Sequence, residues 1–255
     1  MQANKTAPRY RSHIVTSLST RPASLRPTQI LLGIAALAVL VGLGLLWGAR
    51  IAADRFVYVS ELGADGEPTA WAFRWALLLI AGAALVVAGA ARELRSRLRL
   101  LARFTPSFSL VVAAAAFAFA SQVTCTSGCP LPVGPAFTWQ DLLHTAVAVL
   151  GFAAACVAML QVATARNHPG LARLSLLSAI GVAVVAGAGG ILSIARVMVG
   201  LGGILEFVAT TLALLWLAAL AVALIVGIGR RPLVTSAATT EPGLAQTGEQ
   251  IHVAE

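Results

Sequence analysis

Charge is scarce in this sequence. Only 11% of its 255 residues are Asp, Glu, Lys or Arg, whereas soluble domains have roughly a quarter. The deficit is concentrated in long apolar blocks, and the mean hydropathy is +0.87. Such blocks are typical of membrane-spanning helices rather than of one large soluble core. The sequence therefore predicts an integral membrane protein whose surroundings are a lipid bilayer.

The basic residues do not lie within a segment long enough to form a soluble domain. The formal net charge is +8, with 18 Lys and Arg against 10 Asp and Glu. A nucleic-acid-binding domain clusters its basic residues on one folded face. Here they lie in short segments between apolar blocks, where positive charge sets the orientation of membrane helices. This distribution argues against a nucleic-acid partner.

Six apolar blocks approach the ~20 residues that a helix needs to cross a ~30 Å hydrocarbon layer. They cover residues 30–49, 70–91, 104–123, 139–163, 174–195 and 204–228. The third block is the weakest, because Pro106 and several hydroxyl residues shorten its apolar part. Strands are disfavoured, since an open sheet cannot satisfy its edge hydrogen bonds in lipid. We expect an all-α, polytopic bundle of six transmembrane helices.

The two ends of the chain are polar. Residues 1–27 hold five Lys and Arg and three prolines, and residues 229–255 are rich in Thr, Ala, Gly and Glu. Such segments cannot bury enough apolar surface to fold alone, so we predict disordered cytoplasmic tails around a transmembrane domain at 28–228. The first apolar block exceeds the about 7–15 residues of a signal-peptide core and predicts a retained span.

The loops carry an asymmetric charge. Fourteen Lys and Arg fall in the two tails and in the loops after the second and fourth blocks, and four fall on the other side. This excess places the tails and those two loops in the cytoplasm. The single lysine, Lys5, and the abundance of Ala, Gly, Val and Leu favour a GC-rich bacterial source. We therefore expect a multi-pass protein of a bacterial inner or plasma membrane.

Ionisable residues avoid the centres of the six blocks. Those within the blocks lie within about two turns of the outer surface: Arg74, Asp141, His144, Arg196 and Glu206. Pumps and ion-coupled carriers normally place charge near the midplane, so this class is disfavoured. Each residue also has a structural interpretation. Thr138 and Asp141 have capping-box spacing, Glu206 and Arg196 suit helix dipoles, and Arg74 can snorkel.

Taken together, these residues predict a site. Asp141 and His144 are three residues apart and so share one helix face. His144 lies one turn into its span, where an imidazole needs a partner. We hypothesise that Asp141, His144, Arg196 and Glu206, with Arg74, form an outward-facing polar pocket for a small or amphiphilic ligand, because intramembrane ionisable residues are often functional.

Two cysteines lie in the second outer loop, in the segment Cys125-Thr-Ser-Gly-Cys129. The outer side of a bacterial membrane is oxidising, which favours a disulfide that pins the loop. A catalytic pair more often has the spacing Cys-x-x-Cys. Cys156 lies inside an apolar block and is interpreted as an inert apolar residue.

The inventory of reactive residues is poor for catalysis. Of four histidines only His144 faces the outer side, whereas a catalytic zinc takes three protein ligands and a two-histidine haem needs a second histidine. We therefore predict no metal and no cofactor. Ser121 with His144 and Asp141 could imitate a catalytic triad, but no Gly-x-Ser-x-Gly elbow supports it. Two alternatives stay open: an enzyme acting on a lipid or cell-envelope substrate at the outer leaflet, and a small-solute carrier.

Several segments resemble a known family. The segment Tyr-Val-Ser-Glu-Leu-Gly after the first block, Pro-Thr-Ala-Trp-Ala-Phe entering the second, and a glycine-rich fifth block running to Arg196 are similar to six-span prokaryotic membrane proteins catalogued as domain of unknown function nine-nine-eight. A Cys/Pro-rich second outer loop that leads to His144 also resembles them. The resemblance covers about residues 28–228. It implies a six-helix bundle and assigns no activity.

Overall fold

The computed structural model describes residues 26–53, 57–130, 135, 137–165, 169–195 and 198–229. Six α-helices form most of this part of the chain: α1 (Pro27–Ala52), α2 (Ala70–Ala90), α3 (Pro106–Ala120), α4 (Trp139–Ala163), α5 (Pro169–Ile194) and α6 (Val199–Gly229). Three short 3-10 turns accompany them: η1 (Ser60–Gly63), η2 (Ala91–Glu93) and η3 (Leu101–Arg103). The prediction of an all-α protein is confirmed for the described residues, which contain no strand. The predicted tails lie almost entirely outside them.

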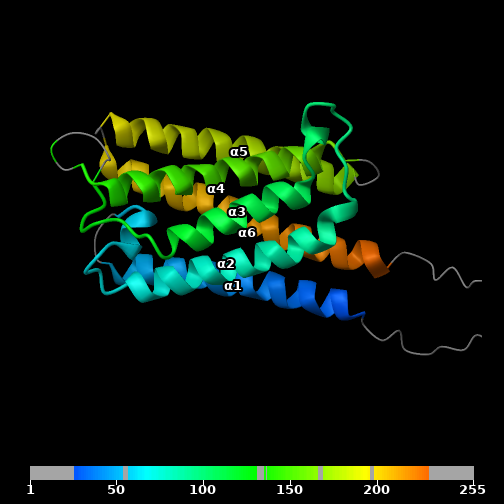
Figure 1. Cartoon of the computed structure of the whole chain (residues 1–255), viewed down its shortest axis with the longest axis horizontal. Coiled ribbons are helices and arrows are strands. Elements are labelled where there is room, and N and C mark those ends of the chain that lie inside the picture. The colour runs from blue at the N-terminus through cyan, green and yellow to red at the C-terminus, as the bar shows by residue number, and fades with distance from the viewer. Residues whose placement is uncertain are drawn as a thin grey trace, which may run out of the picture.

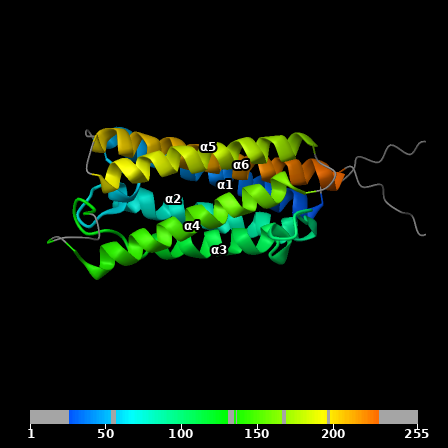
Figure 2. The same ribbon diagram turned by 90° about the horizontal axis from the view of Figure 1, so that it is seen from above.

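The six helices form a closed ring in chain order (Figures 1 and 2). Each helix packs along the next, and α6 returns to pack against α1. Of these neighbouring pairs, α4 and α5 make the least contact. The start of α1 and the end of α6 lie at the same end of the bundle, beside the α2–α3 connection (Figure 1).

Helix α1 shows how the apolar pattern produces this packing. Its buried residues recur at alternating spacings of three and four: Leu32, Ala35, Val39, Gly42, Leu46 and Ala49. This spacing gives one stripe on a helix surface. At Gly42 an added Cβ would lie 3.1 Å from the Ala76 carbonyl oxygen of α2, so the absence of a side chain lets the two helices approach closely. Other positions of α1 are exposed and apolar, as at Leu37.

Five of the helices, all except α3, are long and apolar enough to cross a membrane. Large apolar side chains stay exposed along them, with Leu37, Val149 and Val184 each more than 60% exposed. Surfaces of this kind are favourable in lipid and costly in water. The protein is a polytopic, helical integral membrane protein.

Helix α3 is shorter than the sequence predicted. It has 15 residues, or about 22 Å at 1.5 Å per residue, against an expected range of 104–123. Thr105 caps its start by accepting a hydrogen bond from the Phe108 amide at 3.1 Å. The helix ends at Ala120, and Ser121 is buried beyond it. Non-helical backbone at this depth is tolerated where protein surrounds it.

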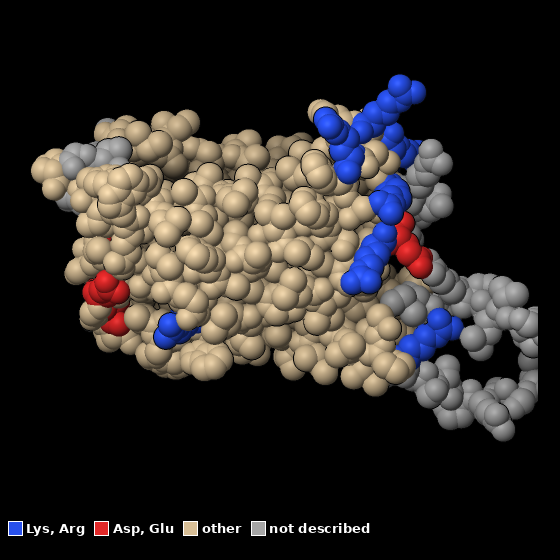
Figure 3. All heavy atoms as spheres, viewed as in Figure 1, with Lys and Arg blue, Asp and Glu red and all other residues tan. Residues whose placement is uncertain are grey.

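Charge separates the two ends of the bundle. Lys and Arg gather at the end that carries the α2–α3 connection (Figure 3), where Arg92, Arg95, Arg97, Arg99 and Arg103 are all exposed. We call this the arginine end. The opposite end carries η1, Asp65, Glu67 and the Cys125–Cys129 pair, and we call it the disulfide end.

Candidate ligand-binding groove

The segment before η1 lies directly on α6 at the disulfide end. An added Cβ at Gly203 would come within 2.9 Å of the Val57 carbonyl oxygen, and one at Gly202 within 3.0 Å of Tyr58 Oη. The glycine pair therefore allows the backbone of this segment to approach the helix. The Val59 amide donates to Glu206 Oε2 at 3.1 Å, which fixes the Glu206 carboxylate beside η1.

Two further hydrogen bonds define the region around Tyr58. The Tyr58 amide donates to Glu61 Oε2 at 3.4 Å. Ser193 Oγ, near the end of α5, donates to Tyr58 Oη at 3.1 Å. The segment of Tyr58 and Val59 therefore contacts α5, α6 and η1. The backbone amides of these two consecutive residues each bind a carboxylate.

The loop after α3 is braced against the first loop. Cys125 and Cys129 form a disulfide, and Cys129 Sγ lies 3.6 Å from Ser60 Oγ. The Asp65 amide donates to the Cys125 carbonyl at 3.0 Å. Gln140 Nε2 donates to the Thr124 carbonyl at 2.8 Å and to Asp65 Oδ2 at 3.1 Å. The two loops thus form one cross-linked cap over the disulfide end.

Asp141 hydrogen-bonds to the second loop of this cap and lines neither of the two cavities described below. Its carboxylate accepts hydrogen bonds from the Thr126 amide at 2.8 Å, from Thr126 Oγ1 at 2.9 Å and from Thr138 Oγ1. Thr138 in turn caps α4 by accepting from the Asp141 amide at 3.0 Å. Asp141 is 1% exposed. The geometry supports the capping interpretation of this residue, extended by an anchor to the second loop.

His144 is also buried, with 2% of its surface exposed. Its Nδ1 lies 2.6 Å from the Val123 carbonyl oxygen, in the non-helical segment that follows the short α3. Ser121 Oγ donates to the Ala118 carbonyl at 2.6 Å instead. The hydrogen bonds of Ser121, His144 and Asp141 thus go to three different partners, an arrangement that gives no support to a catalytic triad.

Of the two predicted arginines, the structure describes only Arg74. Arg74 is exposed on α2, where its guanidinium donates to Gln122 Oε1 at 2.7 Å, and it lines neither of the cavities described below. Arg196 lies outside the described residues. Of the four predicted residues that the structure describes, it brings together His144 and Glu206.

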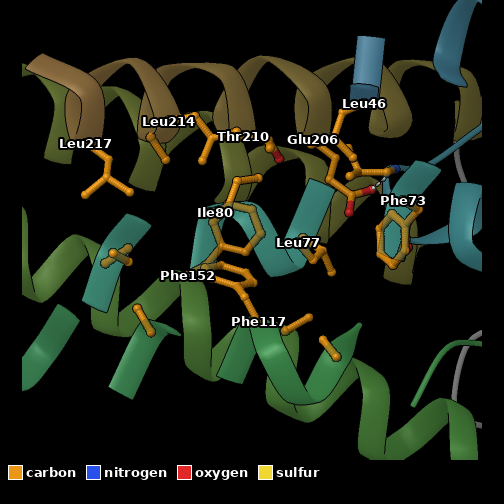
Figure 4. Close-up of a pocket in the computed structure, with 18 of the residues that line it drawn as sticks. Leu46, Phe73, Leu77, Ile80, Phe117, Phe152, Glu206, Thr210, Leu214 and Leu217 are labelled. Carbon is orange, nitrogen blue, oxygen red and sulfur yellow. Dashed lines mark hydrogen bonds between the residues drawn. The ribbon is translucent and has the colours of Figure 1, made fainter. Parts of the chain in front are cut away.

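These two residues line two adjoining cavities. A central cavity of about 80 Å³ lies inside the ring, bounded by α1, α2, α3, α4 and α6 (Figure 4). A lateral groove of about 760 Å³ runs between α4 and α5 and reaches α6. The cavities share five lining residues: Ser60, His144, Ala148, Phe152 and Glu206. The groove therefore meets the centre of the bundle at the level of Glu206.

The lining of the groove changes character along its length. Its polar side chains lie together near the disulfide end: Tyr58, Ser60, His144, Thr145, Ser193 and Glu206. Its other end is lined by small and apolar residues of α4 and α5, including Val149, Ala153, Cys156, Val182 and Ala186. This division into a polar end and an apolar end is the geometry that suits an amphiphile.

No cluster of three or more His, Cys, Asp or Glu able to hold a metal occurs among the residues that the structure describes. Glu206 and His144 are the ionisable residues of the shared lining. The chemistry that this arrangement offers is recognition through a carboxylate, an imidazole and hydroxyl groups.

Residues 57–223 match a family described as a protein of unknown function (DUF998). The chain belongs to this family. The matched range includes η1, both loops of the cap and helices α2 to α5, so the DUF998 region contains every described residue of the groove. The family resemblance drawn from the sequence is confirmed. No curated protein and no solved structure matches the chain.

Four residues of the polar end were not predicted from the sequence: Tyr58, Ser60, Thr145 and Ser193. Their side chains carry hydroxyl groups, whereas the predicted site consisted of acidic and basic residues and a histidine. The glycine pair Gly202 and Gly203, one helical turn before Glu206, was the available signal, because adjacent glycines in a helix often mark a close backbone approach.

Proposed function

We propose that this DUF998 protein binds one amphiphilic molecule per chain in the groove between α4 and α5. The observation that carries the proposal is the division of the groove lining into a polar end and an apolar end. The apolar part of the ligand lies along Ala153, Cys156 and Val182, and its polar end lies beside His144 and Glu206. Binding, rather than catalysis, is the function that these contacts support best.

The size of the groove suits such a ligand. Its volume of about 760 Å³ falls within the roughly 300–1,000 Å³ typical of small-molecule sites. From His144 to Cys156, α4 rises about 18 Å at 1.5 Å per residue. This length accommodates a hydrocarbon chain that runs parallel to the helices, as lipid chains run in a bilayer.

We also propose that the disulfide end faces the outside of a bacterial cell and the arginine end the cytoplasm. The exposed arginines of the α2–α3 connection (Figure 3) support this orientation through the excess of positive charge on cytoplasmic loops. The Cys125–Cys129 disulfide fits an oxidising compartment. In this orientation the ligand is aligned with the lipids of the outer leaflet, its polar end outward.

Filling the apolar half of the groove should abolish binding. Ala153 is exposed and lines the groove, so Ala153→Phe should occupy the space of the chain without disturbing the core. We expect the wild type to bind a fluorescent long-chain amphiphile saturably, one per chain, and the variant to lose at least about tenfold in affinity, since a blocked site forfeits more than ~1.4 kcal/mol.

The matched control is Ala146→Phe, which adds the same side chain to an exposed position of α4 outside the groove. This variant should bind like the wild type. Equal binding by all three proteins, or binding that never saturates, would show that the amphiphile only coats the apolar surface and would refute the proposed function.

A further inference from the structure

The polar end of the groove holds the carboxyl group of Glu206. Glu206 lines both cavities, and no Lys or Arg is among the described lining residues. Burying a carboxylate away from water is costly unless a partner compensates it. The Val59 and Ser60 amides supply hydrogen bonds to Glu206, and a cationic ligand would supply the opposite charge.

A second observation concerns Thr210, four residues after Glu206 on α6. Its hydroxyl oxygen is buried and has no hydrogen-bond partner, although buried polar groups are nearly always paired. The neighbouring Thr211 donates to the Phe207 carbonyl at 2.8 Å, so this helix can satisfy a hydroxyl locally. Thr210 and Glu206 lie on the same face of α6 and both line the central cavity (Figure 4).

These observations point to one class of head group. We propose that the amphiphile carries a primary ammonium group, which enters the central cavity between Glu206 and Thr210; this inference rests on the proposed binding function. A primary ammonium has three N–H donors, enough to reach the Glu206 carboxylate and the Thr210 hydroxyl together. A quaternary ammonium has the charge and no donor.

The size of the central cavity supports the same choice. Its volume is about 80 Å³, while a single water needs at least roughly 10–15 Å³ by the same kind of measure. The cavity therefore has room for a small head group, and the polar side chains of Ser60, His144, Glu206 and Thr210 lie in its otherwise apolar or aromatic lining. The larger groove beside it holds the chain, and Ser60, His144 and Glu206 lie where the two spaces meet.

The test compares amphiphiles that share one chain and differ in head group. Dissociation constants for dodecylamine, dodecyltrimethylammonium, dodecanol and dodecanoate are measured by calorimetry on the full chain in phosphatidylcholine nanodiscs, with Ala153→Phe as the blank for partition into lipid. We expect dodecylamine to bind at least about tenfold more tightly than dodecanol, the effect of one charge-assisted hydrogen bond. Dodecyltrimethylammonium should be intermediate, and dodecanoate weakest.

Two variants locate the effect. Glu206→Gln keeps the shape and should reduce the preference for dodecylamine over dodecanol to within about threefold. Glu93→Gln makes the same change at an exposed acid outside the groove and should preserve the preference. Thr210→Val should remove the preference for dodecylamine over dodecyltrimethylammonium. Equal binding of all four amphiphiles, or tightest binding of dodecanoate, overturns the head-group inference and leaves the binding function intact. Failure of all four to bind above the blank overturns both.

Discussion

A membrane-impermeant maleimide added to intact cells should label a cysteine placed at Pro68 and leave a cysteine placed at Leu100 unlabelled. Pro68 is exposed at the disulfide end and Leu100 at the arginine end. Neither substitution changes the arginines that set orientation. Because the bilayer blocks the reagent completely, the expected contrast is all or none. Labelling is read as a mass shift on a gel.

The control for this experiment is permeabilisation, after which both cysteines should react. The native thiols are made silent by replacing Cys156 with alanine, since Cys125 and Cys129 are joined in a disulfide. Labelling of both positions in intact cells would contradict the prediction that α2 crosses the membrane between them. Labelling of Leu100→Cys alone would reverse the orientation and turn the groove toward the cytoplasmic leaflet.

Replacing Gly63 by alanine should strongly destabilise the cap. An added Cβ at Gly63 would lie 2.1 Å and 2.5 Å from two ring carbons of Phe73, and the ring is buried, with 2% of its surface exposed. Overpacking of this kind typically costs about 1–3 kcal/mol. We expect a thermal unfolding midpoint several degrees lower than that of the wild type in detergent.

Gly44→Ala is the matched control, because an added Cβ there meets nothing within 4 Å. Its midpoint should stay the same or rise slightly, since alanine favours helix by about 1 kcal/mol over glycine. Phe73 lines the central cavity, so Gly63→Ala should also weaken amphiphile binding. A midpoint equal to that of Gly44→Ala would contradict the close packing of η1 on α2.

The helices could be predicted because a run of about 20 apolar residues is by itself enough to indicate a membrane-spanning helix. Five of the six apolar blocks became helices long enough to span a membrane. The third was overestimated, since Thr105 and Pro106 start α3 and the buried Ser121 lies just past its end. The closing contact between α6 and α1, by contrast, joins the two ends of the domain, and no local pattern encodes it.

The candidate site was predictable in part. His144 and Glu206 were identified as ionisable groups near one end, and the structure places both on the same two cavities. Asp141 was grouped with them by its helical spacing from His144, but its carboxylate turns to Thr126 in the second loop. Arg74 faces outward to Gln122. Helical spacing predicts that Asp141 and His144 lie on one face of α4, but it does not predict which loop covers that face.

The central claim is that an amphiphile lies in the α4–α5 groove with its polar end beside Glu206. Photo-cross-linking tests it most directly, with two dodecylamine derivatives that carry a diazirine either next to the amine or at the chain terminus, and with attachment sites mapped by mass spectrometry. We expect the first to label residues near Ser60 and Glu206 and the second to label residues near Cys156 and Val182, with both signals lost in Ala153→Phe. Labels spread over the exposed face of α1, or unchanged in Ala153→Phe, would contradict it.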